Sequence, residues 1–321
     1  MHLPSVLTAV LLIAGCSAVR PDLGSEIVVP AQLSTIQAAV DVAREGTTIL
    51  VAPGVYEESV QIRTKGITIR GARRGSVIID GEVKRANGIV VAASEVTVQN
   101  LTVRNHTSNG VLISAQRDFR VSYVTASNNA LFGIHAFDAQ RGVIEQSYAS
   151  GSANGFYVGH CKPCDVVVRG NVAERNAVGY EGAHASGGMF VLGNRFSGNR
   201  VGLAANVQRE DDVTFVGNLV SDNDEALSPA KADGAFGLGM SITASPRTVF
   251  HNLVTGNPGG DVVVGPVKKA KSPRGIPFTQ VAAPPVQPEM PDGPLPDRTP
   301  NVERYTLPDE DLFDDRAAVR T

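Results

Sequence analysis

The chain of 321 residues contains no tryptophan, and its aromatic content is only 5%. The formal net charge of -3 is too small to argue for a strongly charged partner. No basic stripe with interleaved aromatic residues occurs, so the sequence argues against nucleic acid as a partner. Glycine, in contrast, is abundant, with 33 residues, and 42% of the chain is hydrophobic. This composition favours many short strands joined by tight turns over a helical bundle.

The apolar run over residues 4–14 is too short to cross a bilayer as a stable helix and is typical of a signal-peptide core. It ends in Ile13-Ala14-Gly15-Cys16, which resembles the bacterial lipobox. The resemblance implies that residues 1–15 are removed and that Cys16 becomes the lipid-modified first residue. The protein would then be anchored to the cell membrane on its extracytoplasmic side. The alternative is an ordinary secretory signal with an incidental cysteine, which predicts export equally.

Export would place the two remaining cysteines, Cys161 and Cys164, in an oxidising compartment. Because they lie three residues apart in His160-Cys161-Lys162-Pro163-Cys164, we expect a small disulfide that stiffens one turn. The alternatives are a redox pair and a metal site that includes His160. Two thiolates and one histidine are fewer than the four ligands that structural zinc prefers.

Glycine followed by an apolar residue recurs with a period in the low twenties. The series is Gly88-Ile89, Gly110-Val111, Gly133-Ile134, Gly155-Phe156, Gly179-Tyr180, Gly202-Leu203 and Gly237-Leu238. Such a period is typical of a solenoid in which one repeat makes one coil. Residues distant in sequence then form columns on one surface, so a functional site has to be sought along columns.

Asparagine pairs five residues apart accompany the glycines. The pairs are Asn100/Asn105, Asn171/Asn176, Asn194/Asn199, Asn218/Asn223 and Asn252/Asn257. Asparagine tolerates left-handed backbone and can bond neighbouring backbone groups, so the pairs predict ladders in stacked turns, not ligands. The longer spacing between Asn223 and Gly237 predicts a loop inserted around residues 224–234.

The sequence predicts an all-β solenoid over residues 30–264, with extensions at both ends. Residues 34–43 form an amphipathic helix, in which Ser34 and Gln37 match a capping box, and this helix covers the first coil. Residues 16–29 are expected to be a tether. From residue 265 to 321 the chain is proline-rich and then acidic, which predicts a disordered tail.

Two stretches near the start of this solenoid carry a resemblance to a known family. They are Ser34-Thr35-Ile36-Gln37-Ala38-Ala39-Val40 and Val51-Ala52-Pro53-Gly54-Val55-Tyr56-Glu57-Glu58, which resemble the entry segment of pectin methylesterases. The later Asn-Gly-apolar coils resemble the repeats of the carbohydrate-binding and sugar-hydrolase group that includes NosD-like proteins. The resemblance implies the right-handed parallel β-helix of the pectin-lyase-like superfamily, and a polysaccharide or envelope glycan as partner.

This resemblance does not imply one activity, because the superfamily holds lyases, hydrolases, esterases, epimerases and non-enzymes. The Gln-Asp-Thr and Asp-Phe-Ile-Phe-Gly strings of pectin methylesterases do not occur here, and neither does the Asp-Pro-His motif of uronate epimerases. The resemblance therefore supplies the scaffold and leaves the reaction open.

Two outward columns, two and five residues after glycine, hold titratable side chains in the same three coils. These residues are His135, Tyr157, Glu181, Asp138, His160 and His184. Since coils stack at about 4.8 Å, the six side chains would lie in a patch roughly 10 Å tall. The patch contains acids, bases and a phenol, which is the inventory for general acid–base chemistry on a sugar chain.

Several mechanisms fit this patch. In a lyase or epimerase, Tyr157 or a histidine would exchange the proton beside a uronate carboxylate; in a hydrolase, Asp138 and Glu181 would act as acid and base. Another alternative is an open metal site of His160, His184 and Glu181, although the main prediction includes neither metal nor cofactor. The alternative to glycan chemistry is a non-catalytic scaffold or assembly lipoprotein. We expect a monomer.

Overall fold

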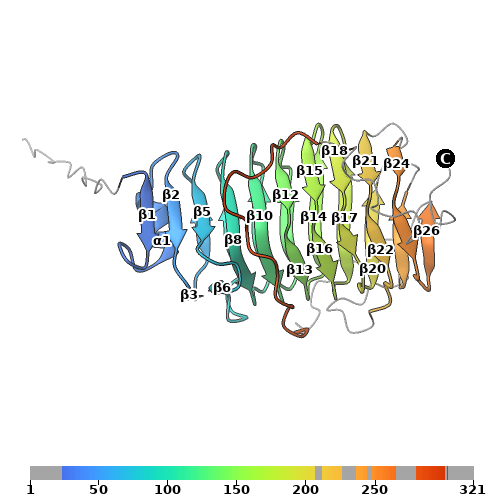
Figure 1. The fold of residues 1–321 in the computed structure, drawn as a ribbon, viewed down its shortest axis with the longest axis horizontal. Coiled ribbons are helices and arrows are strands. Elements are labelled where there is room, and N and C mark those ends of the chain that lie inside the picture. The colour runs from blue at the N-terminus through green and yellow to red at the C-terminus, as the bar shows by residue number, and fades with distance from the viewer. Residues whose placement is uncertain are drawn as a thin grey trace, which may run out of the picture.

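The computed structural model describes residues 24–206, 212–225, 236–243, 248–264, 280–300 and 302. These residues form a right-handed parallel β-solenoid of about 9 turns with one short helix. Figure 1 shows the coils stacked along one long axis, with α1 at the N-terminal end and β26 at the other. No helix among the described residues is long and apolar enough to span a membrane.

Each complete coil contributes three strands, which stack into three rows. One row is a separate 9-stranded sheet: β4 (Val60–Ile62), β7 (Asn87–Val91), β9 (Asn109–Ser114), β11 (Phe132–Phe137), β14 (Asn154–Cys161), β17 (Val178–Ala185), β20 (Val201–Asn206), β23 (Leu238–Ile242) and β26 (Gly260–Val264). The other two rows join into one 17-stranded sheet because two long strands run through both, namely β8 (Thr97–Arg104) and β10 (Arg120–Ser127).

The first row of the 17-stranded sheet is completed by β1 (Glu26–Val29), β2 (Thr48–Val51), β5 (Thr68–Gly71), β12 (Val143–Glu145), β15 (Val166–Arg169), β18 (Met189–Leu192), β21 (Val213–Val216) and β24 (Thr248–Phe250). The second row is completed by β3 (Gly54–Tyr56), β6 (Val77–Asp80), β13 (Tyr148–Ser150), β16 (Val172–Glu174), β19 (Arg195–Phe196), β22 (Leu219–Ser221) and β25 (Leu253–Thr255). All strand pairs are parallel, so the prediction of a parallel β-helix is confirmed.

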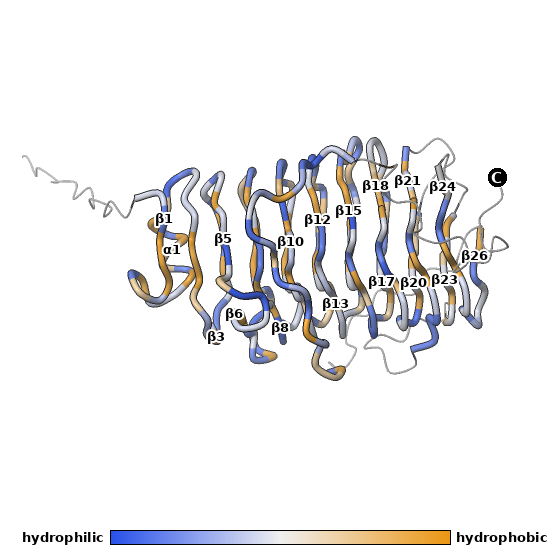
Figure 2. The backbone as a smooth tube through the Cα atoms, viewed as in Figure 1, coloured by the Kyte–Doolittle hydropathy of each residue, from blue (hydrophilic) through white to orange (hydrophobic). Residues whose placement is uncertain are grey.

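Alternation along each strand separates the core from the surface. In β11, Ile134 and Ala136 are fully buried while His135 between them faces outward. Figure 2 shows the same alternation of apolar and polar residues along the coils. The apolar residues that follow the glycines, among them Val111 and Leu203, are core residues as predicted.

Successive coils approach very closely at the glycine column. A Cβ atom added to Gly179 would lie 2.5 Å from the carbonyl oxygen of Gly202, a distance that no side chain tolerates. In the repeat after Gly202 the column member is Gly239, which lies against Gly202, so the prediction of Gly237 for this place is wrong. The residues inserted before this repeat change its spacing, and counting from Gly237 is two residues out of register.

Two asparagine ladders align the turns between rows. Their rungs are Asn171, Asn194, Asn218 and Asn252 in the first ladder, and Asn176, Asn199, Asn223 and Asn257 in the second. Asn199 Oδ1 accepts from the backbone N of Asn176 at 3.1 Å and from its Nδ2 at 3.0 Å. Its own Nδ2 donates to the carbonyl of Ala173 at 2.8 Å. The turn-ladder prediction is therefore confirmed for these pairs.

The pair Asn100/Asn105 differs from the prediction. Both residues have positive φ, 57° and 60°, and lie one residue before the ladder positions. The second ladder instead starts at His106, whose backbone N and ring Nδ1 lie 3.1 and 3.0 Å from Oδ1 of Asn129. His106 is fully buried, and burial lowers the pKa of its imidazole.

The inserted loop lengthens one coil without breaking the ladder. Asn199 bonds to Asn223, 24 residues later, whereas Asn223 bonds to Asn257, 34 residues later. The ladder therefore continues on both sides of the insertion, at the place where the spacing predicts it. Residues 226–235 themselves lie outside the described residues.

A helix, α1 (Ile36–Val42), covers the first coil as predicted, but its cap differs. Thr35, not Ser34, is the N-cap, and its Oγ1 accepts from the backbone of Ala38 at 3.1 Å. The carboxylate of Glu58, from the following coil, accepts two further N–H groups of the first turn at 3.0 and 2.9 Å. The neighbouring coil thus supplies part of the cap, which no local pattern reveals.

The chain enters the solenoid earlier than the predicted tether allows. Within residues 16–29, Glu26–Val29 forms β1, which pairs with β2 and buries Ile27 and Val29 in the core. Cys16 and the rest of residues 1–23 lie outside the described residues, so the signal peptide and the lipid anchor stay predictions.

Residues 280–300 lie across the outer face of the 17-stranded sheet, and we call them the C-terminal strap (Figure 1). The carbonyl of Pro288 accepts from Arg74 at 3.0 Å, and that of Pro296 accepts from Arg120 at 2.7 Å. This order differs from the disordered tail predicted for residues 265–321. Prolines remove N–H donors from the strap, but its carbonyls find guanidinium donors on the sheet. Residues 265–279, 301 and 303–321 lie outside the described residues.

The predicted disulfide between Cys161 and Cys164 is present, with Cα atoms 4.8 Å apart. Both residues are at most 1% exposed and belong to the hydrophobic core, and the backbone N of Ser186 in the next coil lies 3.2 Å from Cys164 Sγ. A buried pair is out of reach of a second thiol, so this geometry favours a structural staple over redox exchange.

We predict that Gly179→Ala lowers the thermal unfolding midpoint, because its methyl group would push against the Gly202 carbonyl. Overpacking of this kind costs about 1–3 kcal/mol. Gly75→Ala is the matched control, since a Cβ at Gly75 meets nothing within 4 Å. Differential scanning calorimetry of both variants measures the effect, and equal midpoints would contradict a steric role for the column.

We predict that His106→Asn removes part of the acid sensitivity of folding. Because the pKa of buried His106 is lowered below its unfolded value of about 6.5, its stabilising contribution is complete above that pH and is lost as pH falls. Asparagine occupies the equivalent rung in later coils and does not titrate. Unfolding midpoints at pH 7.5 and pH 5 should therefore differ less in the variant than in the unmodified protein.

Candidate functional site

The structure brings the first predicted column together on the 9-stranded sheet. His135 pairs with Tyr157, and Tyr157 pairs with Glu181 on the next strand. Leu112 and Ala204 occupy the same column in the flanking coils. The coil register inferred from the glycines is therefore correct in β11, β14 and β17.

The second column also forms, at the far ends of the same strands. Asp138, His160 and His184 have positive φ of 51°, 61° and 54°, so the backbone turns at these residues. All three side chains are exposed. The column therefore forms a rim beside the flat part of the sheet.

Aromatic and imidazole rings link the two columns into one surface, which we call the ring row. Its members are Phe132, His135, Phe137, Tyr157, His160 and His184. His135 stacks on Phe132 with ring centroids 4.0 Å apart and meets Tyr157 edge-on at 4.8 Å.

Phe137 extends the ring row toward the rim. Its ring centroid lies 6.0 Å from that of His135 and 4.8 Å from that of His160, and His160 lies 5.3 Å from His184. Phe137 is 40% exposed, which is unusual for a large apolar side chain in a chain with few aromatic residues. The ring row is thus continuous across three neighbouring strands.

Because Gly159 has no side chain, the ring of Tyr157 can lie over it. A Cβ atom on Gly159 would lie 2.6 Å from the Tyr157 hydroxyl, so the phenol lies flat over this glycine. Tyr157 is consequently only 8% exposed although it points outward. The small residue keeps the outer surface shallow beside Phe137.

The electrostatics of the site keep its central groups neutral. Burial, assisted by nearby His160, lowers the pKa of His135 to about 4. Burial, assisted by the charge of Glu181, raises the pKa of Tyr157 to about 12. His135 Nδ1 lies 3.1 Å from Oδ1 of Asn109, so in the neutral imidazole Nδ1–H donates to this amide oxygen.

The two acids of the predicted hydrolase pair face different parts of the sheet. Oε2 of Glu181 accepts from Nδ2 of Asn154 at 2.7 Å, which draws this carboxylate toward the start of the strands. Asp138 lies at their ends, aligned with His160. Glu181 lies in register with Tyr157, three positions before His160, and three positions along a strand correspond to about 10 Å. The two acids therefore lie in different columns and in coils that are two apart.

A metal centre receives no support from the described part of the chain. No group of three or more His, Cys, Asp and Glu residues within it is arranged to hold a metal ion. The alternatives built on His160, with Glu181 and His184 or with the cysteines, therefore lack a ligand set.

Sequence reasoning missed two members of the ring row, Phe132 and Phe137. They occupy the positions one before and four after Gly133, whereas the prediction considered the positions two and five after it. The signal was available, because strict alternation makes the fourth position outward as well as the second. Phe132 turns outward because Gly133 and Ile134 both face the core, which spacing alone does not reveal.

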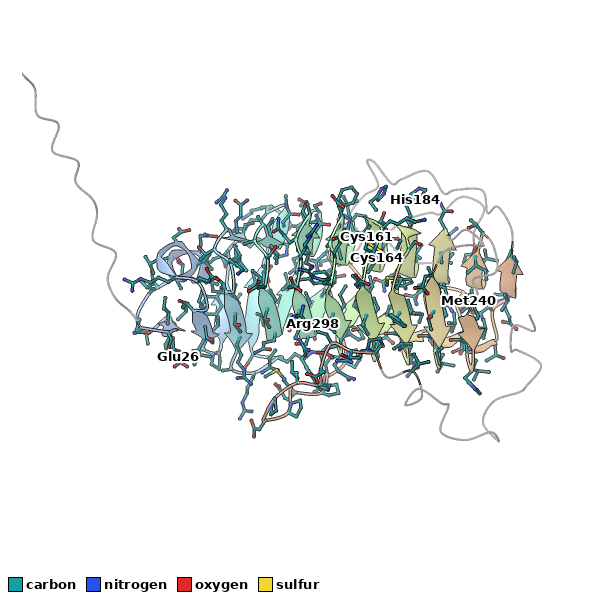
Figure 3. All side chains as sticks on the ribbon, turned by 90° about the horizontal axis from the view of Figure 1, so that it is seen from above. Glu26, Cys161, Cys164, His184, Met240 and Arg298 are labelled. Carbon is teal, nitrogen blue, oxygen red and sulfur yellow. A yellow bond between two sulfur atoms is a disulfide. The ribbon has the colours of Figure 1, made fainter. Side chains whose placement is uncertain are left out.

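The ring row and the C-terminal strap lie on different sides of the solenoid. Figure 3 shows His184 on one side and Arg298, within the strap, on the opposite side. The strap bonds to the 17-stranded sheet through Arg74, Arg120 and Arg169. None of its described contacts is made with the ring row.

Two solved structures share the fold at low identity. The pectate lyase Pel9A has a TM-score of 0.50 and 13% identity, with 71% of this chain and 68% of that chain covered. The alginate lyase from Paenibacillus sp. str. FPU-7 has a TM-score of 0.50 and 16% identity, with coverage of 72% and 95%. A pectin methylesterase from Yersinia enterocolitica reaches a TM-score of 0.41 at 12% identity, with coverage of 73% and 81%. At these identities the likeness to the two lyases shows the fold alone.

No curated protein sequence matches the chain. The family model described as "Right handed beta helix region" matches residues 54–220 and 109–268, which together span more than half of the sequence. This match corresponds to three features of the structure: the stacked parallel coils, the glycine column and the asparagine ladders. The chain therefore belongs to the family of proteins with a right-handed beta helix region.

Proposed function

We propose that the protein binds a polysaccharide along the outer face of the 9-stranded sheet, outside the cytoplasm. The observation that carries this proposal is the ring row, a continuous set of ring contacts on three adjacent strands. Sugar rings present apolar C–H faces that pack on aromatic rings, with hydroxyls at their edges for hydrogen bonds. A shallow, ring-lined face beside polar groups suits such a ligand.

Polar groups border the ring row on two sides. Asn109, Asn154 and Glu181 lie toward the start of the strands, and the exposed side chain of Asp138 lies at their ends. Half-buried Glu181 and exposed Asp138 are placed to exchange hydrogen bonds with sugar hydroxyls, while buried Asn109 and Asn154 bond to His135 and Glu181. The fold neighbours, a pectate lyase and an alginate lyase by name, are consistent with a glycan partner.

Binding fits the central groups better than proton abstraction does. A general base works best with a pKa near the working pH, whereas burial holds the pKa of His135 near 4 and that of Tyr157 near 12. Modification of the glycan is the second candidate, and the exposed pair His160 and His184 favours it, since these two members of the ring row lie at its open rim.

The cellular location we propose is the outer side of the cell membrane, through lipid on Cys16. This rests on the lipobox-like Ile13-Ala14-Gly15-Cys16. The buried disulfide supports an oxidising compartment, because cytosolic thiols are kept reduced. The alternative of a non-catalytic assembly scaffold shares this location and differs in predicting no glycan affinity.

We predict that Phe137→Ala weakens polysaccharide binding by about 10-fold or more, because truncation removes an aromatic platform worth about 1.4 kcal/mol or more. Affinity electrophoresis in gels containing neutral or acidic polysaccharides measures the change. Val55→Ala is the control, since Val55 is 57% exposed and lies on β3 of the 17-stranded sheet, outside the ring row. Absence of binding to every glycan tested, or equal loss in both variants, would rule out the ring row as a glycan site.

Tyr157→Phe separates binding from chemistry. The variant keeps the ring and its contacts with His135 but loses the phenolic proton, so binding should be retained within about twofold. If the unmodified protein also releases unsaturated or reducing-end products from the glycan, and Tyr157→Phe abolishes this release, Tyr157 acts as an acid–base residue. Ultraviolet absorbance of the unsaturated products and reducing-sugar assays follow the release.

We predict that Cys16→Ser shifts the protein from the membrane fraction to the soluble extracytoplasmic fraction. The serine hydroxyl cannot form the thioether that carries the diacylglyceryl group. Fractionation with immunoblotting, together with metabolic labelling by a fatty-acid analogue, measures both outcomes. Unchanged membrane association without label in the unmodified protein would contradict lipidation.

A further inference from the structure

Besides covering the 17-stranded sheet, the C-terminal strap places the guanidinium of Arg298 beside the turn that contains Asp118. Arg74 anchors its first part, donating from its backbone N to Glu289 at 2.8 Å and from its side chain to the carbonyl of Pro288. Arg169 then donates to the carbonyl of Asp297 at 3.0 Å. These bonds fix the position of the next residue, Arg298.

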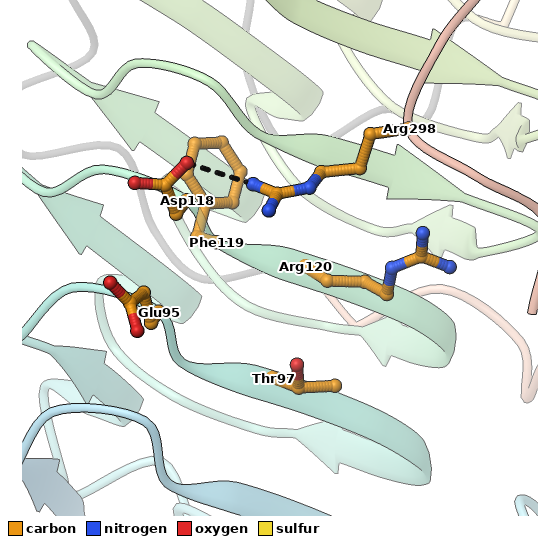
Figure 4. A pocket seen from close by; sticks show the side chains of 6 residues that line it. All are labelled: Glu95, Thr97, Asp118, Phe119, Arg120 and Arg298. Carbon is orange, nitrogen blue, oxygen red and sulfur yellow. Dashed lines mark hydrogen bonds and ion pairs between the residues drawn. The ribbon is translucent and has the colours of Figure 1, made fainter. Parts of the chain in front are cut away.

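Arg298 closes one side of a pocket at the edge of the first strand row. Its Nη1 lies 3.0 Å from Oδ1 of Asp118 and donates to the carbonyl of Arg141 at 3.0 Å. The pocket has a volume of about 440 Å³. Its lining residues are Glu95, Thr97, Asp118, Phe119, Arg120 and Arg298 (Figure 4).

The lining offers both acceptors and donors. The carboxylates of Glu95 and Asp118 accept hydrogen bonds, the guanidinium of Arg298 donates them, and the hydroxyl of Thr97 does both. Phe119 is only 1% exposed, so the accessible surface is mainly polar. A ligand held here needs hydroxyl groups at several edges, and an apolar ligand would leave these groups unpaired.

The charges around the pocket are already balanced. Glu95 pairs with Lys65 at 3.1 Å, and Arg120 pairs with the buried carboxylate of Glu145 at 2.6 Å. Asp118 pairs with Arg298, and the guanidinium groups of Arg141 and Arg298 lower the pKa of its carboxyl. A charged ligand would have to disturb one of these pairs, whereas a neutral polyhydroxylated ligand can bond to them unchanged.

We propose that this pocket binds one neutral sugar unit, as a second carbohydrate site separate from the ring row, and that Arg298 of the strap completes it. The volume accommodates a monosaccharide, and the mixture of carboxylate, hydroxyl and guanidinium groups matches vicinal hydroxyls. The site lies on the 17-stranded sheet, so its occupancy does not depend on the function proposed for the ring row.

Titration of the full chain with D-glucose and D-galactose by ligand-observed NMR tests the proposal. A ligand of this size is expected to bind with a Kd of about 1–10 mM. Thr97→Val removes a hydroxyl at constant shape, and Arg298→Ala removes the donor supplied by the strap; each should weaken binding about 5-fold or more. D-galacturonate and D-glucosamine, which carry a charge, should bind more weakly than the neutral sugars.

Thr48→Val and Arg195→Ala are the matched controls. Thr48 lies in the same column as Thr97 two coils away, and Arg195 is exposed on β19, so both variants should bind like the unmodified protein. Failure of both neutral sugars to bind, or binding that Thr97→Val and Arg298→Ala leave unchanged, would overturn the proposal. Binding that Phe137→Ala removes while Thr97→Val preserves it would assign the sugar to the ring row and overturn it equally.

Discussion

The close approach of neighbouring coils at the glycine column is the constraint on which the other columns depend. At Gly179 and its equivalents the space beside the next carbonyl holds a hydrogen atom and nothing larger. The register set there is carried into the turns by amide ladders, in which each asparagine bonds to the backbone and side chain of the coil before it. Where a coil carries both the glycine and the ladder asparagines, it is fixed at several corners, and its outward side chains stack in columns with those of its neighbours.

Because outward side chains stack in columns, one repeating backbone presents several faces that differ in chemistry. The outer face of the 9-stranded sheet carries rings, with His135 and Tyr157 held neutral by burial. The 17-stranded sheet carries arginines, such as Arg74 and Arg120, which donate to the strap. The core behind both is hydrophobic, and it combines many aliphatic side chains with buried rings such as Phe156 and Phe196. The residues in the outward columns therefore decide the function of this fold. They can change while the core stays the same.

Periodicity in the sequence is enough to predict the stacking of coils, but it holds no information on side-chain contacts between distant parts of the chain. The alignment of His135, Tyr157 and Glu181 results from a regular glycine spacing, so it was predictable. The choice of Gly239 over Gly237 was not, because an insertion had changed the spacing. The orientation of Glu181 toward Asn154 depends on a side-chain bond between coils, and the column pattern does not contain this information.

The ladder bonds and the bonds to the strap differ in how far apart their partners lie along the chain. Ladder bonds join residues 23 to 34 positions apart, so each coil can form on the one before it with a small loss of chain entropy. The bond between Arg74 and Glu289 spans 215 positions and needs several finished coils as its platform. Each coil of the solenoid can thus fold onto the coil before it. The strap can bind only after the coils beneath it have folded.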